Sequence, residues 1–266
     1  MSRRFAPAPL RMKVYMLVRE QVAKNEFEGA TRFLEGLKED GLTMPSRETI
    51  RRWARAETSP YTGKRIFDAE PSEELSFFLG AWIGDGWGDE NDGGKRMRLK
   101  VRSEGFAAEF ARSASVILSK SVPYRVWTTA DERGPWYNVK VTSFMLFEFV
   151  NRPMEELRAF IEPFPIGFLR GLFTAEGNPS VSIERRNGPH LSAGLAVANS
   201  DRKLLEFSRE LLSKLGYHPG QIRLNFLVGK RTNLGVARSS GWLLSLSRLE
   251  DARKFANEVS FADSTK

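Results

Sequence analysis

Two acidic residues, Asp85 and Glu176, each stand at the end of an apolar segment that contains glycine. The first segment is FLGAWIGDG, residues 78–86, and the second is LRGLFTAEG, residues 169–177. The apolar spacing predicts that each segment is a buried helix whose C-terminal end carries the acid, where the helix dipole disfavours negative charge. Two carboxylates brought close together repel each other unless a cation lies between them. If the two helices pack side by side, so that their C-terminal ends meet, a divalent cation that prefers oxygen ligands is the expected occupant between the acids.

The segments that follow each acid also repeat one another in order. KRMRLKVR, residues 95–102, alternates apolar with basic side chains and predicts a strand with one face on a core. Further strand patterns lie in PYRVWTT and WYNVKVT in the first half, and in VSI, LSAGLAVA, QIRLNFLV and WLLSLS in the second. Helical patterns lie in SEGFAAEFARSASVILSK, SFMLFEFVN, NSDRKLLEFSRELLSKLG and RLEDARKFANEV. Each half is therefore predicted to run helix, two strands, helix, two strands, helix, as two subdomains related by a pseudo-twofold axis.

The first 70 residues carry a different, helical pattern. Two segments, KVYMLVREQVAKN and ATRFLEGLKEDG, precede PSRETIRRWARAE, in which Ser46 is a good N-cap and Ile50 and Trp53 face inward. Arginines cover the outer side of this third helix, namely Arg47, Arg51, Arg52 and Arg55. Two helices, a turn and a basic helix are typical of a helix-turn-helix DNA-binding unit, although a small bundle with a solvated arginine face has the same pattern. SPYTGKRIFDAEPS then predicts a linker.

The composition of the chain narrows the kinds of site and partner. The 266 residues include no cysteine and two histidines, which excludes disulfides, thiolate zinc sites and cysteine nucleophiles and disfavours a histidine metal cluster. Lysine and arginine number 41 against 33 acidic residues, a net charge of +8, which favours a polyanionic partner. No apolar run is long enough to cross a bilayer and MSRRFAPAPL lacks a signal-peptide pattern. We therefore expect a cytoplasmic protein with no membrane partner, and an organellar location stays open.

The two motifs and the matching segments after them resemble the LAGLIDADG homing endonucleases in their single-chain, two-motif form. The resemblance spans residues from about 73 to 260, where YNVKVTSFMLFEF and NSDRKLLEF are also similar to family segments. The N-terminal part resembles the helix-turn-helix extensions of some members. The resemblance implies an α+β fold, a duplicated αββαββα unit with two saddle-shaped antiparallel sheets, plus a small all-α N-terminal domain. The expected parts are 1–70, the helix-turn-helix-like extension and linker, and two subdomains, 71–164 and 165–266.

The family resemblance also implies an activity. Members are sequence-specific endonucleases, encoded in mobile introns or similar elements, that cut both strands of DNA and leave short 3′ overhangs. Small residues in the motifs would let the two helices pack directly together. These small residues are Gly80, Ala81, Gly84, Gly171 and Ala175. Asp85 and Glu176 would then meet as catalytic residues and metal ligands, and the carbonyls of Gly84 and Ala175 could add ligands, as they do in the family. The expected cofactor is Mg²⁺, for which Mn²⁺ could substitute, and it would activate the attacking water.

The expected partner is double-stranded DNA with a long, asymmetric site, bound by a monomer. Two curved sheets would lie along the major groove, with side chains that suit phosphates or base edges. In the subdomains these candidates are Arg96, Arg98, Lys100, Arg102, Arg125, Asn138, Lys140, Arg223, Asn225, Lys230, Arg231 and Arg238. In the N-terminal part they are Arg47, Arg51 and Arg52.

The chain departs from the family pattern in two places. Family members often place a lysine just after the second motif, but this chain has Asn178 and Pro179 there. Lys100, Arg102 and Lys140 are possible substitutes among which the sequence does not choose. The outer face of LSAGLAVA is serine, glycine and alanine, so the two halves are expected to contact DNA unequally.

Three other functions compete with DNA cleavage. A DNA-binding regulator on the same fold would not cut, but retention of both acids argues against it. An RNA maturase would use the same basic surface on intron RNA, and the sequence cannot separate this activity from DNA binding. A self-splicing intein is disfavoured, because the chain has no cysteine, its first residues show no splicing block and it does not end in His-Asn.

Overall fold

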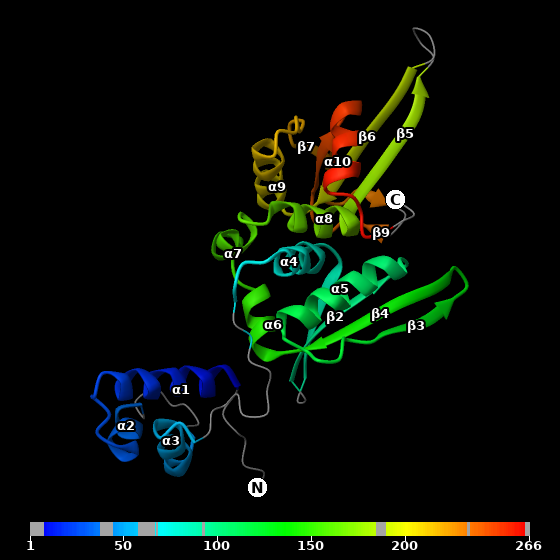
Figure 1. Ribbon diagram of the computed structural model, residues 1–266. Helices are drawn as coiled ribbons and strands as arrows, with labels where there is room; N and C mark the ends of the chain where they lie inside the picture. The colour runs from blue at the N-terminus through cyan, green and yellow to red at the C-terminus, as the bar shows by residue number, and fades with distance from the viewer. Residues whose placement is uncertain are drawn as a thin grey trace. The chain divides into compact units, whose positions relative to one another are not determined.

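The chain divides into two compact units, Met1–Ile66 and Phe67–Lys266, each with its own apolar core (Figure 1). The computed structural model describes residues 8–37, 45–57, 67, 69–91, 94–184, 190–232 and 235–263. Among these residues, no helix has both the length and the apolar character needed to cross a membrane.

The first unit is helical, as the sequence predicts. It contains three helices, α1 (Ala8–Ala23), α2 (Ala30–Leu37) and α3 (Arg47–Ala54). The Ser46 hydroxyl caps α3 by accepting a hydrogen bond of 3.2 Å from the Thr49 N–H, and Ile50 and Trp53 are buried. The predicted cap and inward-facing residues are therefore confirmed.

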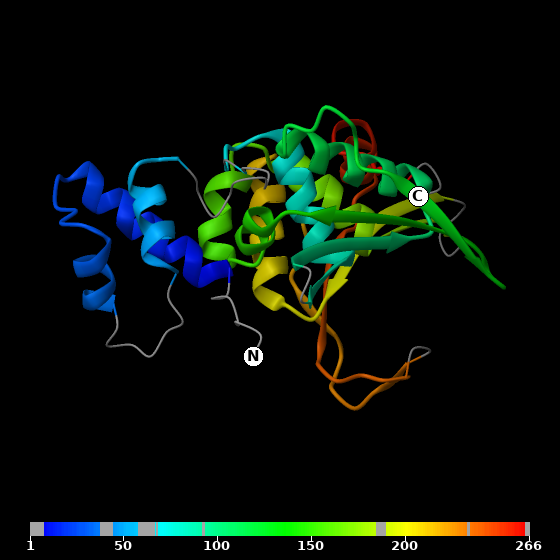
Figure 2. The same ribbon diagram turned by 90° about the horizontal axis from the view of Figure 1, so that it is seen from below.

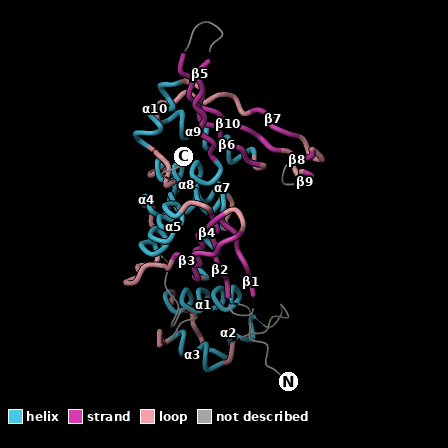
Figure 3. Tube along the Cα trace, turned by 90° about the vertical axis from the view of Figure 1, so that its right-hand side faces the viewer, coloured by secondary structure: helices cyan, strands magenta, loops and turns pink. Residues whose placement is uncertain are grey.

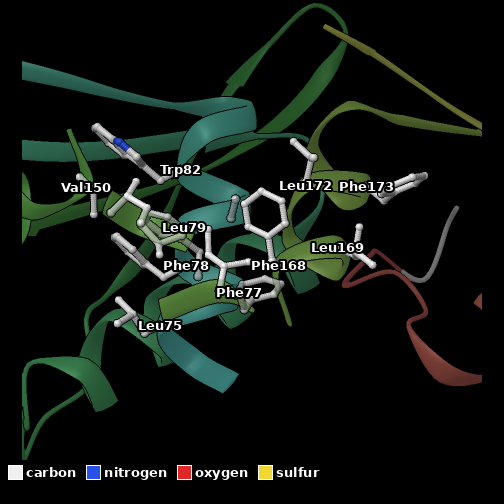
Figure 4. Close-up of a cluster of buried hydrophobic side chains, with 14 of the residues drawn as sticks. Leu75, Phe77, Phe78, Leu79, Trp82, Val150, Phe168, Leu169, Leu172 and Phe173 are labelled. Atoms are coloured by element: carbon white, nitrogen blue, oxygen red, sulfur yellow. The ribbon is translucent and has the colours of Figure 1, made fainter. Parts of the chain in front are cut away.

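The second unit is built on two helices that carry the repeated motifs. These are α4 (Glu73–Asp85) and α8 (Pro165–Glu176). The two helices cross at glycines. A Cβ atom on Gly171 would lie 2.7 Å from the backbone nitrogen of Ala81, and a Cβ atom on Gly80 would lie 2.9 Å from the backbone nitrogen of Leu172. Because any larger side chain would force the helices apart, the prediction of small residues at this crossing is confirmed. Phe77, Phe168 and Leu172 pack around the crossing (Figure 4).

Each motif helix leads into a four-stranded antiparallel sheet with the predicted order of elements. The first half continues with β1 (Gly86–Asn91), β2 (Gly94–Val101), α5 (Glu104–Ile117), β3 (Val126–Asp131), β4 (Gly134–Thr142) and α6 (Phe144–Val150). The second continues with β5 (Gly177–Glu184), β6 (His190–Asn199), α9 (Arg202–Lys214), β7 (Arg223–Phe226), β10 (Gly241–Leu246) and α10 (Leu249–Glu258). The sheet orders are β1-β2-β4-β3 and β5-β6-β10-β7. The two groups of strands lie on either side of α4 and α8 (Figure 3).

Two features of this unit were not predicted from the sequence. Helix α7 (Met154–Ile161) joins the two halves. The basic loop after β7 contains a small hairpin of β8 (Arg231–Thr232) and β9 (Gly235–Val236), which projects from the rest of the unit (Figure 2).

The alternating pattern of β2 divides the first sheet into a core face and an outer face. Met97, Leu99 and Val101 are buried, together with Val139 and Val141 of the neighbouring strand β4. The basic residues between them lie on the opposite side of the sheet. The fold therefore presents the cations of β2 and β4 on a single surface.

Candidate metal centre and nucleic-acid interface

The C-terminal ends of α4 and α8 adjoin each other. A Cβ atom on Gly84 would collide with the Cβ of Ala175 and would lie 3.4 Å from the Glu176 Cγ. Asp85 is the last residue of α4 and is exposed, and Glu176 is the last residue of α8 and is half-buried. The helix packing thus sets the two acidic residues at adjoining helix ends, although they are 91 residues apart in the sequence.

Both helices end by the same local geometry. The Gly86 N–H donates to the Trp82 carbonyl, and the Gly177 N–H donates to the Phe173 carbonyl. Each glycine then begins a strand. A Cβ atom on Gly86 would lie 2.8 Å from the Trp82 Cα, and a Cβ atom on Gly177 would lie 2.9 Å from the Phe173 carbonyl carbon. The glycine after each acid is therefore required by this tight passage from helix to strand.

The chemistry of this place suits a hard divalent cation. The oxygen groups at the two helix ends are the carboxylates of Asp85 and Glu176 and the backbone carbonyls of Gly84 and Ala175. Mg²⁺ binds through one or two carboxylates and keeps water and phosphate oxygens as its other ligands. The described residues contain no group of three or more histidine, cysteine or acidic side chains that could hold a metal ion.

A polar side chain that the sequence analysis missed lies beside Glu176. The Asn199 amide donates a hydrogen bond of 3.4 Å to the Glu176 Oε1, and its own oxygen accepts one of 2.8 Å from the Asp201 N–H. Asn199 is the last residue of β6, at the junction with α9. The Asn-Ser-Asp sequence at this junction was the available signal. These bonds orient one of the two carboxylates.

Strand register distinguishes the surroundings of the two acids. Gly86 pairs with Leu99 of β2. Because β1 and β2 are antiparallel, the residue before Gly86, which is Asp85, lies next to the residue after Leu99, which is Lys100. In the second sheet Gly177 pairs with Val197, so the matching residue beside Glu176 is Ala198. A cation is therefore available near the first acid and has no counterpart at the matching position near the second.

The outer face of the first sheet holds both paired and unpaired cations. Arg98 forms an ion pair of 2.7 Å with Asp89. Arg102 binds both oxygens of Asp131, at 2.8 and 2.9 Å, and donates to the Gly134 carbonyl. A different set forms no ion pair with any residue that the structure describes. This set is Arg96, Lys100 and Lys140, and we call it the free cations.

Asp131 is the anchor of the β3–β4 hairpin. Hydrogen bonds from the Trp136 indole N–H and from the Arg102 guanidinium lower the pKa of Asp131 to about 2. The Arg102 guanidinium also lies 3.7 Å above the Trp136 ring. Arg102 is therefore engaged in holding the hairpin together.

The other candidates lie on several separate elements. Asn138 is on the outer face of β4, where its amide donates to the Trp127 and Trp136 carbonyls and to the Thr129 hydroxyl. Several further candidates are exposed on or next to strands and in the β8–β9 loop, namely Arg125, Arg223, Asn225, Lys230, Arg231 and Arg238. In the first unit three are exposed on α3, namely Arg47, Arg51 and Arg52. Two of these approach acids, Arg51 at 3.7 Å from Glu48 and Arg52 at 3.9 Å from Glu57.

Comparison with known proteins places this fold in a family. Residues 163–260 match the LAGLIDADG-like domain. The uncharacterised protein MJ0398 of Methanocaldococcus jannaschii is 31% identical over 224 residues, which cover 82% of this chain and 77% of that protein. A second uncharacterised protein of this organism, MJ0314, is 27% identical over 150 residues, 55% and 56% of the two chains.

A solved structure shows the same fold. A variant of the homing endonuclease I-DmoI, in complex with its nicked target DNA and with Mn present, is 22% identical with a TM-score of 0.50, covering 72% of this chain and 97% of that one. The N-terminal LAGLIDADG domain of WhiA is 16% identical with a TM-score of 0.46, covering 73% and 85%. The chain belongs to the LAGLIDADG family. The resemblance found in the two sequence motifs and the predicted α+β fold are thus both confirmed.

Proposed function

We propose that this protein is a metal-dependent, sequence-specific endonuclease of double-stranded DNA. The observation that carries this proposal is the contact of Gly84 with Ala175 and Glu176, which shows that the two helices ending in Asp85 and Glu176 adjoin at those ends. The family and the folds of DNA-bound relatives agree with a DNA ligand.

The residues of the site would divide the chemistry among them. Asp85 and Glu176 would hold the cation, with the Gly84 and Ala175 carbonyls as further ligands. Mg²⁺, or Mn²⁺ in its place, would lower the pKa of a water molecule and offset the charge of the scissile phosphate. Lys100 would donate to the phosphate or orient the attacking water, because the strand register places it beside Asp85. Among the three residues that the sequence leaves open, Lys100 is therefore the one that we propose.

The duplex would lie along the outer faces of the two sheets as a long, asymmetric site. In the first sheet the free cations would bind phosphates. The second sheet presents a neutral face of Ser192, Gly194, Ala196 and Ala198, so the β8–β9 hairpin would supply its cations. The first unit would add contacts as a helix-turn-helix through the arginines of α3. A monomer, encoded in a mobile intron or a similar element, is the form we propose.

The test is cleavage of a randomised duplex library in Mg²⁺ followed by sequencing of the ends. The wild-type protein should yield defined ends with short 3′ overhangs, and the Asp85→Asn and Glu176→Gln variants should bind the same sites without cutting. Specific binding by the wild type with no cleavage would refute the endonuclease and leave a DNA-binding regulator. Equal cleavage by either variant would show that the metal is held elsewhere.

A further inference from the structure

Three tryptophans share the outer face of the first sheet. Trp87 pairs with Arg98, Trp127 with Asn138, and Trp136 with Thr129, so all three lie on the side opposite the buried valines of β4. Trp87 is 42% exposed, and Trp127 and Trp136 are half-buried. By contrast, the core tryptophans Trp53 and Trp82 are only 3% and 7% exposed. We call the three outer residues the tryptophan face.

Burial in a core does not explain the tryptophan face, although Trp136 also holds the β3–β4 hairpin through Asp131. An exposed large aromatic side chain gains little from burial, so its presence on a surface indicates a binding role. Two of the three rings, those of Trp136 and Trp127, also have neighbours that the structure describes. The Trp136 ring is fixed by its hydrogen bond of 2.6 Å to Asp131 and by the stacked Arg102, and Lys100 lies 5.0 Å from it. Trp127 borders an open hollow of about 610 Å³ that is also lined by Arg125 and Thr128.

The chemistry of the tryptophan face fits unpaired bases better than paired ones. The major groove of a duplex offers the edges of bases, which are read by side chains with several hydrogen-bond donors and acceptors. Tryptophan has one donor, no acceptor and a broad flat ring, and it stacks on the faces of bases that are not paired. The free cations lie on the same face of the sheet, where they can follow a phosphate backbone. A sheet that carries aromatic rings among cations is a common platform for single-stranded nucleic acid.

We propose that the outer face of the first sheet binds a single-stranded segment of nucleic acid. Unpaired bases stack on the tryptophan face, while Arg96, Lys100 and Lys140 hold the phosphates. The segment is either RNA or a strand of opened DNA, since both present the same rings and phosphates. This binding needs neither the carboxylates nor a metal, so it does not depend on the proposed cleavage. Because the proposed duplex contacts use the same face, the two ligands should compete.

The experiment is a fluorescence-anisotropy titration of the full chain in EDTA, which prevents any metal-dependent cleavage. The probes are labelled oligo(U) and oligo(dT) of about 16 nucleotides, within the usual range of single-strand sites, and a random-sequence duplex. The Trp87→Ala and Trp127→Ala variants are compared with Leu224→Ala and Val181→Ala, which remove exposed apolar side chains from the second sheet. Trp136 is left intact because it holds the β3–β4 hairpin.

Each tryptophan variant should weaken binding of the single strands by about 5- to 100-fold, the effect of losing one stacked base, and the two control variants should leave it unchanged. Duplex affinity should change less than single-strand affinity. Stronger binding of oligo(U) than of oligo(dT) would identify RNA as the ligand, and equal binding would identify any unpaired strand. Single-strand binding that is unaffected by both tryptophan variants would overturn the proposal. So would an equal loss of duplex affinity, which would assign the tryptophans to the duplex.

Discussion

Single residues determine how closely the two motif helices approach. Gly80 and Gly171 lie where the backbones touch, and Gly86 and Gly177 lie where each helix turns directly into a strand. At all four positions a Cβ atom would meet backbone within 3.0 Å. The carboxylates are thus positioned by residues that have no side chain.

We therefore predict that Gly171→Ala strongly destabilises the second unit. The added Cβ would lie 2.7 Å from the Ala81 nitrogen, and overpacking of this kind costs about 1–3 kcal/mol. Thermal unfolding of the full chain should show a Tm lower by several degrees, at about 2–4 °C per kcal/mol. Gly36→Ala is the matched control, since this helical glycine has no neighbour within 4 Å of its Cβ position. The control should be neutral or slightly stabilising, and an equal loss in both variants would refute the steric argument.

A second prediction at this scale concerns the anchor of the β3–β4 hairpin. The pKa of Asp131 is lowered from its ordinary 3.8 to about 2 by Trp136 and Arg102. Since the folded pKa lies below the unfolded one, the stabilisation is complete above about pH 4 and is lost as the pH falls toward 2. A carbon-13 NMR titration of the side-chain carboxyl should give a midpoint near 2. In the Trp136→Phe variant the midpoint should rise, and a wild-type midpoint near 3.8 would contradict the hydrogen-bonded geometry.

At the scale of elements, strand register makes the two halves chemically different. The helices and strands repeat in the same order in both halves. The position on the neighbouring strand that comes next to the acid, however, is Lys100 in the first half and Ala198 in the second. Asn199 further engages Glu176, whereas Val101, at the matching end of β2, is a buried apolar residue. Two copies of one fold therefore offer unequal surroundings to the two strands of a duplex.

From this asymmetry we predict that the two strands are cut at unequal rates. Supercoiled plasmid that carries the site should accumulate a nicked intermediate before it becomes linear. Lys100→Ala should slow the faster step by about 100-fold, at the lower end of the range for positioned proton-transfer groups. Lys203→Ala, on the exposed side of α9, is the control and should have no effect.

Ala198→Lys provides the converse test of the same idea. A lysine at this position should reduce the accumulation of nicked plasmid by accelerating the slower step. Concerted linearisation by the wild type, or an unchanged nicked fraction in both variants, would show that the asymmetry of the register has no catalytic consequence.

The sequence predicts the elements well because their signals are local. Alternation in residues 95–102 and the periodicity of the motif helices are set by neighbours in the chain, and both are confirmed. Contacts across strands were not predictable, because they depend on register. Arg102 is four residues from Arg98 in sequence, yet one holds Asp131 at the hairpin and the other Asp89 on β1. The bond from Asn199 to Glu176 was missed for the same reason.

At the scale of the whole molecule, the net charge of +8 does not mean that every basic side chain is available to bind phosphate. Some cations of the first sheet are neutralised within the fold, as Arg98 is by Asp89 and Arg102 by Asp131. The free cations on the same sheet have no such partner among the described residues. A count of basic residues therefore overstates the number of phosphates that this surface can bind.

The salt dependence of DNA binding tests this distinction between paired and free cations. Each phosphate contact releases counterions and contributes about 0.9 to the slope of log affinity against log salt. In EDTA with a random-sequence duplex, Arg96→Ala and Lys140→Ala should each flatten the slope by about that amount. Arg102→Ala should leave the slope unchanged and instead lower the thermal stability, since its guanidinium holds the β3–β4 hairpin. If Arg102→Ala flattened the slope as much as Arg96→Ala did, the ion pair with Asp131 would have to open on binding. If none of the three variants changed the slope, the DNA would lie on another surface of the molecule, and the cations of the first sheet would serve only the single-stranded ligand.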